Sequence, residues 1–137
     1  MNKPFFILTV MASMLLLLSQ TSCSPEIVLA QSLEGDWDVE SFTVDGEETI
    51  GFLITSFTLE FEEYDGEEGD FEFVLIGENG ASTTTKGEYA INSDGTELDL
   101  DYDDGSREEW DISLEGDDLE LSGNFDGERI ELKAERD

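Results

Sequence analysis

Apolar and polar side chains alternate in short segments from about residue 35 to the end of the chain. Clear examples of this alternation are Phe57, Leu59 and Phe61; Leu98, Leu100 and Tyr102; Trp110, Ile112 and Leu114; and Ile130, Leu132 and Ala134. A period of two places successive side chains on opposite faces of a β-strand, so each segment predicts a strand with one face available for burial.

Short turn signals separate these segments. They contain Gly beside Asp, Asn or Glu and occur at Asp45-Gly46, Asp65-Gly66, Glu78-Asn79-Gly80, Asp94-Gly95, Asp104-Gly105, Gly116-Asp117 and Asp126-Gly127. Gly, Asn and Asp favour the positive φ angles of tight hairpins. Because connections this short leave no room for crossover helices, the strands are expected to run antiparallel.

The segments predict eight strands, and the first of them contains an irregularity. Its inward parity changes after Val39, which predicts a β-bulge near Glu40-Ser41. Eight hairpin-connected strands can close into an up-and-down barrel, which leaves no exposed edge. A barrel of this size is either filled by side chains or holds one small ligand. We therefore expect an all-β, eight-stranded antiparallel up-and-down barrel over residues 33–137.

Residues 1–22 have the pattern of a signal peptide. Lys3 precedes an apolar run over residues 5–18, which is too short to span a bilayer comfortably and long enough for a signal sequence. Small polar residues follow, directly before Cys23, the single cysteine of the chain. This arrangement resembles the signal of bacterial lipoproteins, including those of Bacteroidetes. The resemblance implies that Cys23 is lipidated, that residues 23–32 form a short tether and that the protein is an outer membrane lipoprotein facing the periplasm or the cell surface.

A second interpretation of the N-terminus is ordinary signal cleavage after Ala30, with Val28 and Ala30 as the small residues. That cleavage would leave a soluble periplasmic or secreted protein without a cysteine. Lipidation is favoured because a lone cysteine cannot form an internal disulfide and stands where the acylation would need it. Two or more acyl chains would anchor the protein stably in a membrane.

The charge of the chain limits its partners. With 36 Asp and Glu against 6 Lys and Arg, the formal net charge is -30. So large a negative charge excludes nucleic acid as a partner. Acidic chains can be disordered, but here the acids occupy alternate strand positions and leave the others apolar. The acids therefore predict a charged coat around a folded core.

The residue types argue against an enzyme. The chain has no His, the usual general base near neutral pH and the commonest transition-metal ligand, so Ser and Thr lack a partner to activate them. The run Asp99, Asp101, Asp103 and Asp104 precedes Gly105, but the glycine is one place late for an EF-hand calcium loop. The run is better explained as a solvated strand face. We expect no cofactor and no metal site.

One motif makes the fold prediction more specific. Gly35 and Trp37 form a Gly-x-Trp sequence at the head of the first strand, and Arg136 has inward parity at the end of the last. The pattern resembles the lipocalins and their calycin relatives, in which a basic residue of the last strand lies across the tryptophan ring. The resemblance implies a lipocalin-like barrel in which Arg136 contacts Trp37. The first and last strands of such a barrel pair antiparallel, and the contact would gain from cation–π attraction.

Several side chains are candidates for a ligand pocket inside the barrel. They are Phe52, Phe57, Phe73, Thr85, Tyr89, Tyr102, Trp110 and Phe125. The competing interpretation is that the aromatic rings only fill the barrel. Small or polar groups at Thr83, Thr85 and Gly87, and an apolar loop at residues 50–54 that could cover the barrel mouth, favour a pocket.

The sequence thus leads to an exported, lipid-anchored, lipocalin-like protein that binds a small apolar molecule. The alternative is a protein-interaction module with a solid barrel, such as a periplasmic inhibitor or an adhesion-type protein, whose loops contact a protein partner. A cavity of about 300 Å³ or more, open beneath the loop at residues 50–54, would favour the ligand, whereas a filled interior would favour the protein partner.

Overall fold

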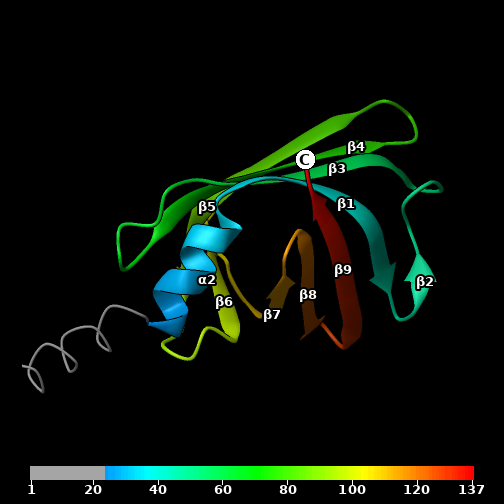
Figure 1. Cartoon of the computed structure of the whole chain (residues 1–137). Helices are drawn as coiled ribbons and strands as arrows, with labels where there is room; N and C mark the ends of the chain where they lie inside the picture. The colour runs from blue at the N-terminus through cyan, green and yellow to red at the C-terminus, as the bar shows by residue number, and fades with distance from the viewer. Residues whose placement is uncertain (1–23) are drawn as a thin grey trace, which may run out of the picture.

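The computed structural model describes residues 24–137, which form one helix and nine strands. Their bounds are α2 (Pro25–Leu33), β1 (Gly35–Val44), β2 (Glu47–Glu48), β3 (Ile54–Phe61), β4 (Gly69–Gly77), β5 (Ser82–Ile91), β6 (Glu97–Tyr102), β7 (Arg107–Glu115), β8 (Asp118–Phe125) and β9 (Glu128–Arg136). All strands except the two-residue β2 follow one another in chain order around an antiparallel barrel, which closes because β1 pairs with both β3 and β9 (Figure 1). The predicted eight-stranded up-and-down barrel is confirmed. The predicted signal peptide and Cys23 lie outside the described residues.

The predicted irregularity in β1 is present. The pairing of β1 with β9 passes from Val39 opposite Ala134 directly to Ser41 opposite Lys133, so Glu40 has no partner in this ladder. This bulge lets strand β1 keep an apolar inner face on both sides of it, because Phe42 then packs against Phe57 with 5.5 Å between ring centroids.

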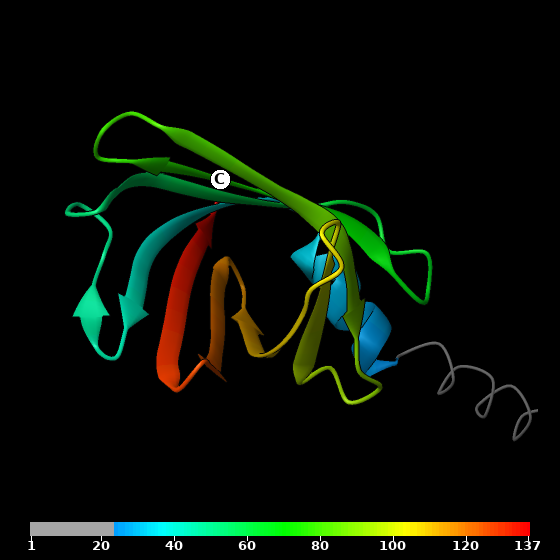
Figure 2. The same ribbon diagram turned by 180° about the vertical axis from the view of Figure 1, so that it is seen from behind.

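One end of the barrel is closed and densely packed. Helix α2 lies at this end, where it contacts β7 and where Pro25 lies next to Gly95 in the turn between β5 and β6 (Figures 1 and 2). The helix contributes Ala30 and Leu33, which are 1% and 0% exposed. Among the largest fully buried side chains are Trp37, Phe61, Tyr89, Leu98 and Leu119, and each lies in the half of its strand nearer to this end. The main core therefore fills the closed half of the barrel.

The helix is a feature that the sequence did not predict. Residues 23–32 were expected to be a tether, whereas residues 25–33 form α2 with Pro25 in its first turn, where the fixed φ of proline suits a helix start. Leu33 accepts a 2.8 Å hydrogen bond from the indole nitrogen of Trp37 through its backbone carbonyl. The segment before the first strand is thus part of the packed domain. Within residues 24–137, no helix is long and apolar enough to cross a membrane.

The lipocalin-type contact between the first and last strands is present. Arg136 Cζ lies 4.3 Å from the centroid of the Trp37 ring. Gly35 has a φ of +125°, and a Cβ atom there would lie 3.1 Å from Arg136 Nη1. A side chain at this position would therefore be strained and would crowd the arginine, which explains the glycine of the Gly-x-Trp sequence.

Candidate functional site

The opposite end of the barrel is open because two strand ladders stop short of it. The ladder between β5 and β6 ends at Gly87 opposite Tyr102, so residues 82–86 extend beyond β6. The ladder between β7 and β8 ends at Asp111 opposite Ser122, although both strands continue. In both views the β4–β5 hairpin projects past the neighbouring strands (Figures 1 and 2).

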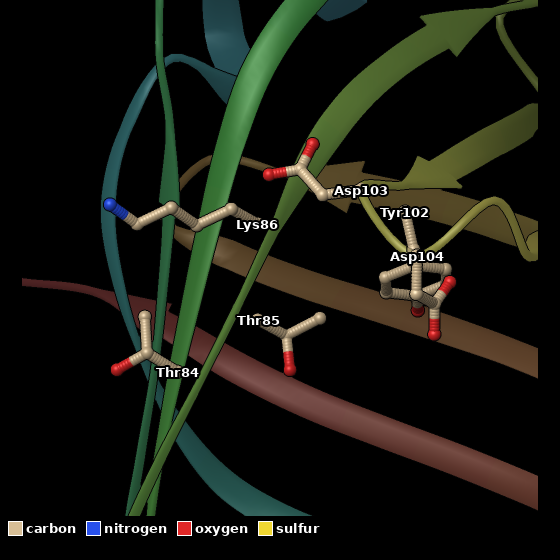
Figure 3. A pocket seen from close by; sticks show the side chains of 6 residues that line it. All are labelled: Thr84, Thr85, Lys86, Tyr102, Asp103 and Asp104. Atoms are coloured by element: carbon tan, nitrogen blue, oxygen red, sulfur yellow. The ribbon is translucent and has the colours of Figure 1, made fainter.

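Two adjoining pockets occupy this opening. The first has a volume of about 580 Å³ and is lined by Thr84, Thr85, Lys86, Tyr102, Asp103 and Asp104 (Figure 3). The second, of about 540 Å³, shares Thr85, Tyr102 and Asp104 and adds Ser106, Arg107, Glu108, Asn124, Phe125 and Asp126. We call the two pockets together the β5–β8 cleft. Either volume is large enough for a small organic ligand.

The strand register explains which side chains of the cleft point into the barrel. Residues directly opposite each other in an antiparallel ladder share a face of the sheet. Thr85 lies opposite Phe73, which lies opposite the buried Leu59. Glu108 lies opposite Leu100, whose side chain is 0% exposed. Thr85 and Glu108 are therefore both on the inner face.

Tyr102 and Glu108 form a polar pair within the cleft. The Tyr102 hydroxyl donates a hydrogen bond to Glu108 Oε1. Burial, and next the Glu108 carboxylate, raise the pKa of Tyr102 well above its ordinary value, while the neighbouring Trp110 acts in the opposite direction. Trp110 is only 7% exposed, and within the described residues its buried Nε1 has no hydrogen-bond acceptor. The cleft thus combines the inward Tyr102–Glu108 pair with the further charged side chains Lys86, Asp103, Asp104, Arg107 and Asp126, and the buried indole N–H of Trp110 lies next to it.

Aromatic rings line the cleft and continue behind it. Phe125 packs against Trp110 with 4.6 Å between ring centroids, and Tyr102 packs edge-on against Phe71 at 5.5 Å. A Cβ atom at Gly123 would lie 2.6 Å from the Phe125 ring. Glycine at this position therefore leaves the space in which the Phe125 ring lies over the strand.

The structure brings together five of the eight residues predicted for the pocket and places a sixth next to them. Thr85, Tyr102 and Phe125 line the cleft, Trp110 packs on Phe125, and Phe73 lies opposite Thr85 across the ladder. Phe57 packs against Phe73 at 6.3 Å between centroids.

Tyr89 and Phe52 lie elsewhere. Tyr89 is 1% exposed in the core, where its hydroxyl donates a 2.5 Å hydrogen bond to the carbonyl of Glu62. Phe52 is 68% exposed and lines neither pocket of the cleft. The loop that carries Phe52 is held by backbone hydrogen bonds to the Thr49 carbonyl and by one from Glu78 N to Leu53 O. This loop does not cover the cleft.

Glu108 is a cleft residue that the sequence pattern did not single out. The signal was present, because Glu108 stands two residues before Trp110 and so shares its parity. It was hidden because Glu108 is followed by Glu109, and the pair resembles the rest of the acidic coat. Only the register with Leu100 separates the inward Glu108 from the exposed Glu109.

The acidic run before Gly105 forms ion pairs with an arginine. Arg107 lies 3.5 Å from an oxygen of Asp99 and 3.4 Å from an oxygen of Asp101. Among residues 24–137, no group of three or more His, Cys, Asp or Glu side chains is placed to hold a metal ion.

Comparisons with known proteins relate the chain to others by fold alone. No family model and no curated protein matches the sequence. Japanin from Rhipicephalus appendiculatus, in a structure bound to cholesterol, matches with a TM-score of 0.56 and 9% identity over 76% of each chain. Lobster apocrustacyanin A1 matches with a TM-score of 0.54 and 16% identity over 78% of this chain and 62% of its own.

Designed barrels are equally similar. The redesigned barrel mFAP1, in a structure bound to DFHBI, matches with a TM-score of 0.57 and 19% identity over 79% of this chain and 98% of its own. These likenesses agree with the strand topology and show an all-β, lipocalin-like barrel.

Proposed function

We propose that this protein binds a small, mainly apolar molecule in the β5–β8 cleft. The observation that carries the proposal is the open end of the barrel, where two pockets of about 580 and 540 Å³ meet at Thr85 and Tyr102. Aromatic rings at Tyr102, Phe125 and the adjoining Trp110 provide apolar surface. Most of the other lining residues are polar or charged, and small-molecule sites use such groups to fix the orientation of a ligand against apolar surface. A binding function without catalysis fits a chain that lacks His.

The structural neighbours support a small-molecule ligand. Japanin and mFAP1 are lipocalin-like or designed barrels whose structures were determined with cholesterol and DFHBI bound, respectively. Both show that a barrel of this general shape accommodates a compact organic molecule. The chemical nature of the ligand of this protein must follow from its own cleft.

We further propose export and lipid anchoring through Cys23. Only one residue separates Cys23 from Pro25, where α2 begins at the closed end. An acylated Cys23 would hold the closed end toward the membrane and leave the cleft facing the aqueous phase. Cys23→Ala should move the protein from the detergent phase to the aqueous phase in a partitioning experiment, and unchanged partitioning would exclude the anchor.

Binding can be tested with the neutral, environment-sensitive dye Nile red. Thr85→Phe places a ring in the space shared by both pockets and should weaken dye binding at least about tenfold. Ser113→Phe adds the same ring on the exposed outer face of β7 and should leave binding unchanged. Equal binding by the two variants, or no binding by the parent protein, would contradict a ligand site in the cleft.

A second candidate function is contact with a protein partner through the loop at residues 50–54. Phe52 and Leu53 are exposed by 68% and 66%, which is unusual for neighbouring large apolar residues. Cross-linking in the native envelope should then depend on these two side chains and be lost in a Phe52→Ser, Leu53→Ser variant that still binds Nile red.

A further inference from the structure

The most informative group in the cleft is the carboxylate of Glu108. It lies on the inner face of β7, opposite Leu100 and two residues from the buried Trp110. Around it in the same pocket are Tyr102 and Phe125, whose rings are apolar surface. A charged group placed among aromatic rings loses part of its hydration, which is unfavourable unless a partner compensates for the loss.

No cation of the described chain provides this compensation. Within residues 24–137, no Lys or Arg nitrogen lies within 4.0 Å of a Glu108 oxygen, because the two cations beside the cleft are paired elsewhere. Arg107 lies next to Glu108 in sequence, but its guanidinium is directed to Asp99 and Asp101. Lys86 Nζ lies 3.6 Å from a carboxylate oxygen of Glu72.

Glu108 has one neutral hydrogen-bond partner, Tyr102, and one of its carboxylate oxygens is free to accept a hydrogen bond from a ligand. Tyr102 donates to Oε1, and no described residue donates to Oε2. A carboxylate accepts hydrogen bonds at both oxygens, so it can bind a further donor. A charged donor is favoured, because hydrogen bonds between two ionised groups are stronger than those between neutral groups.

The surroundings favour a cation over an anion. Ring faces attract an organic cation, and Tyr102, Trp110 and Phe125 are gathered beside Glu108. Asp104 and Asp126 also line the second pocket, Arg107 of the same lining is paired with Asp99 and Asp101, and the whole chain carries a net charge of -30. Such a field attracts cations to the cleft and repels carboxylate ligands such as fatty acids.

We propose that the β5–β8 cleft selects an organic ammonium ion with an apolar body, and that Glu108 binds the ammonium group while the aromatic rings contact the body. This inference rests on the proposed function and specifies the ligand class. Tyr102 has only a secondary role, since its hydroxyl holds one oxygen of Glu108 and leaves the other free for the ligand.

The test compares three probes that share one alkyl chain: decylamine, decanol and decanoate. Each competes with Nile red for the protein at pH 7 and an ionic strength of about 0.15 M, where exposed charges are screened beyond about 8 Å. Decylamine is then a cation, decanol is neutral and decanoate is an anion. We expect decylamine to bind at least about tenfold more tightly than decanol, and decanoate to bind most weakly.

A matched pair of variants separates Glu108 from the general acidic field. Glu108→Gln and Glu109→Gln each remove one negative charge from adjacent residues of β7, one facing inward and one exposed. Glu108→Gln should lower the affinity for decylamine about tenfold, to near that for decanol. Glu109→Gln should change it less than about twofold. Circular dichroism and thermal unfolding should show that both variants fold like the parent.

Tyr102→Phe distinguishes direct binding from a structural effect. It removes the Tyr102–Glu108 hydrogen bond but keeps the carboxylate, so it should retain most of the preference for decylamine. If Tyr102→Phe loses that preference as completely as Glu108→Gln, Glu108 acts through local structure and the inference is wrong. The inference is also overturned if decanol binds as tightly as decylamine, or if the two glutamine variants behave alike. In those cases the proposed function stands. If neither Nile red nor any of the three probes binds, the inference and the proposed function are both wrong.

Discussion

Arg136 lies across Trp37 and also ties the closed end of the barrel together. Its Nη1 donates a 3.0 Å hydrogen bond to the carbonyl of Glu34, and its Nη2 donates to the carbonyl of Ser32. Its Nε lies 3.3 Å from Asp117 Oδ1 in the β7–β8 turn. One arginine thus connects the end of α2, the first strand, the last strand and a turn, around a fully buried indole.

This connection predicts unequal and coupled costs of mutation. Trp37→Ala should reduce the free energy of unfolding by about 3 to 5 kcal/mol, because it leaves a large cavity in the core. Arg136→Ala should cost about 1 to 2 kcal/mol, since the arginine is partly exposed but forms several hydrogen bonds. Because the two side chains touch, the double variant should differ from the sum by at least about 0.5 kcal/mol in denaturant unfolding. Strictly additive losses would show that the contact contributes nothing.

The packing of α2 predicts that residues before the first strand stabilise the domain. Leu33→Ala should lower the free energy of unfolding by about 2 to 5 kcal/mol, because Leu33 is 0% exposed. Val28→Ala on the same helix is the control. Val28 is 52% exposed, so its loss should change stability by less than about 0.5 kcal/mol. Equal, small effects in thermal or chemical unfolding would mean that the segment is only a tether.

The tyrosines predict a loss of stability in alkali. Burial, and next a hydrogen bond to Glu26, raise the pKa of Tyr64 to about 12, and burial raises the pKa of Tyr89 in the same direction. A phenol whose pKa is higher in the folded protein stabilises the fold below its unfolded pKa of about 10 and ceases to do so as the pH rises toward 12. Phenolate absorbance should therefore appear well above pH 10 in the native protein and near pH 10 in urea.

Tyr64→Phe should remove the absorbance step near pH 12 and flatten the fall in stability between pH 10 and 12. Native tyrosines that all titrate near pH 10 would contradict the burial and hydrogen bonding described for them.

The acidic coat predicts that salt stabilises the protein. Outward carboxylates lie next to one another and perturb each other's titration. The neighbouring Glu88 raises the pKa of Glu68, and Glu40 raises the pKa of Glu135. Sodium chloride shortens the Debye length from about 30 Å at 0.01 M to about 3 Å at 1 M and so weakens this repulsion. The thermal midpoint should rise over that range. A flat or falling midpoint would show that the coat does not oppose folding.

The barrel could be predicted from sequence because strand alternation and turn residues are local signals. Even the bulge beside Glu40 was predicted, since a change of parity is visible within one strand. The helix at residues 25–33 was missed because a nine-residue segment with few buried positions has little periodicity, and its fold depends on contacts with Trp37. Phe52 was expected at the barrel mouth because apolar loops usually need cover, but its side chain is 68% exposed and lines neither pocket of the cleft.

The inward side chains of the open end were only partly predictable. Thr85, Tyr102 and Phe125 follow from parity, which the sequence shows. The cleft itself results from two ladders that stop early, at Gly87 and Asp111, and no local pattern marks where a ladder ends. The sequence therefore showed which rings face inward but not where the space between them lies.

The proposed ligand enters the open end of the barrel near Trp110 and not the closed end near Trp37. The chain has 2 Trp residues, so Trp37→Phe and Trp110→Phe each leave one fluorescent indole. The probes are decylamine and decanol that each carry a bromine at the far end of the chain. Bromine quenches the fluorescence only of indoles that lie close to it. We predict that both probes quench the fluorescence of Trp110 in the Trp37→Phe variant. The fluorescence of Trp37 in the Trp110→Phe variant should not change. Equal quenching of both, or quenching of Trp37 alone, would contradict a binding site in the β5–β8 cleft.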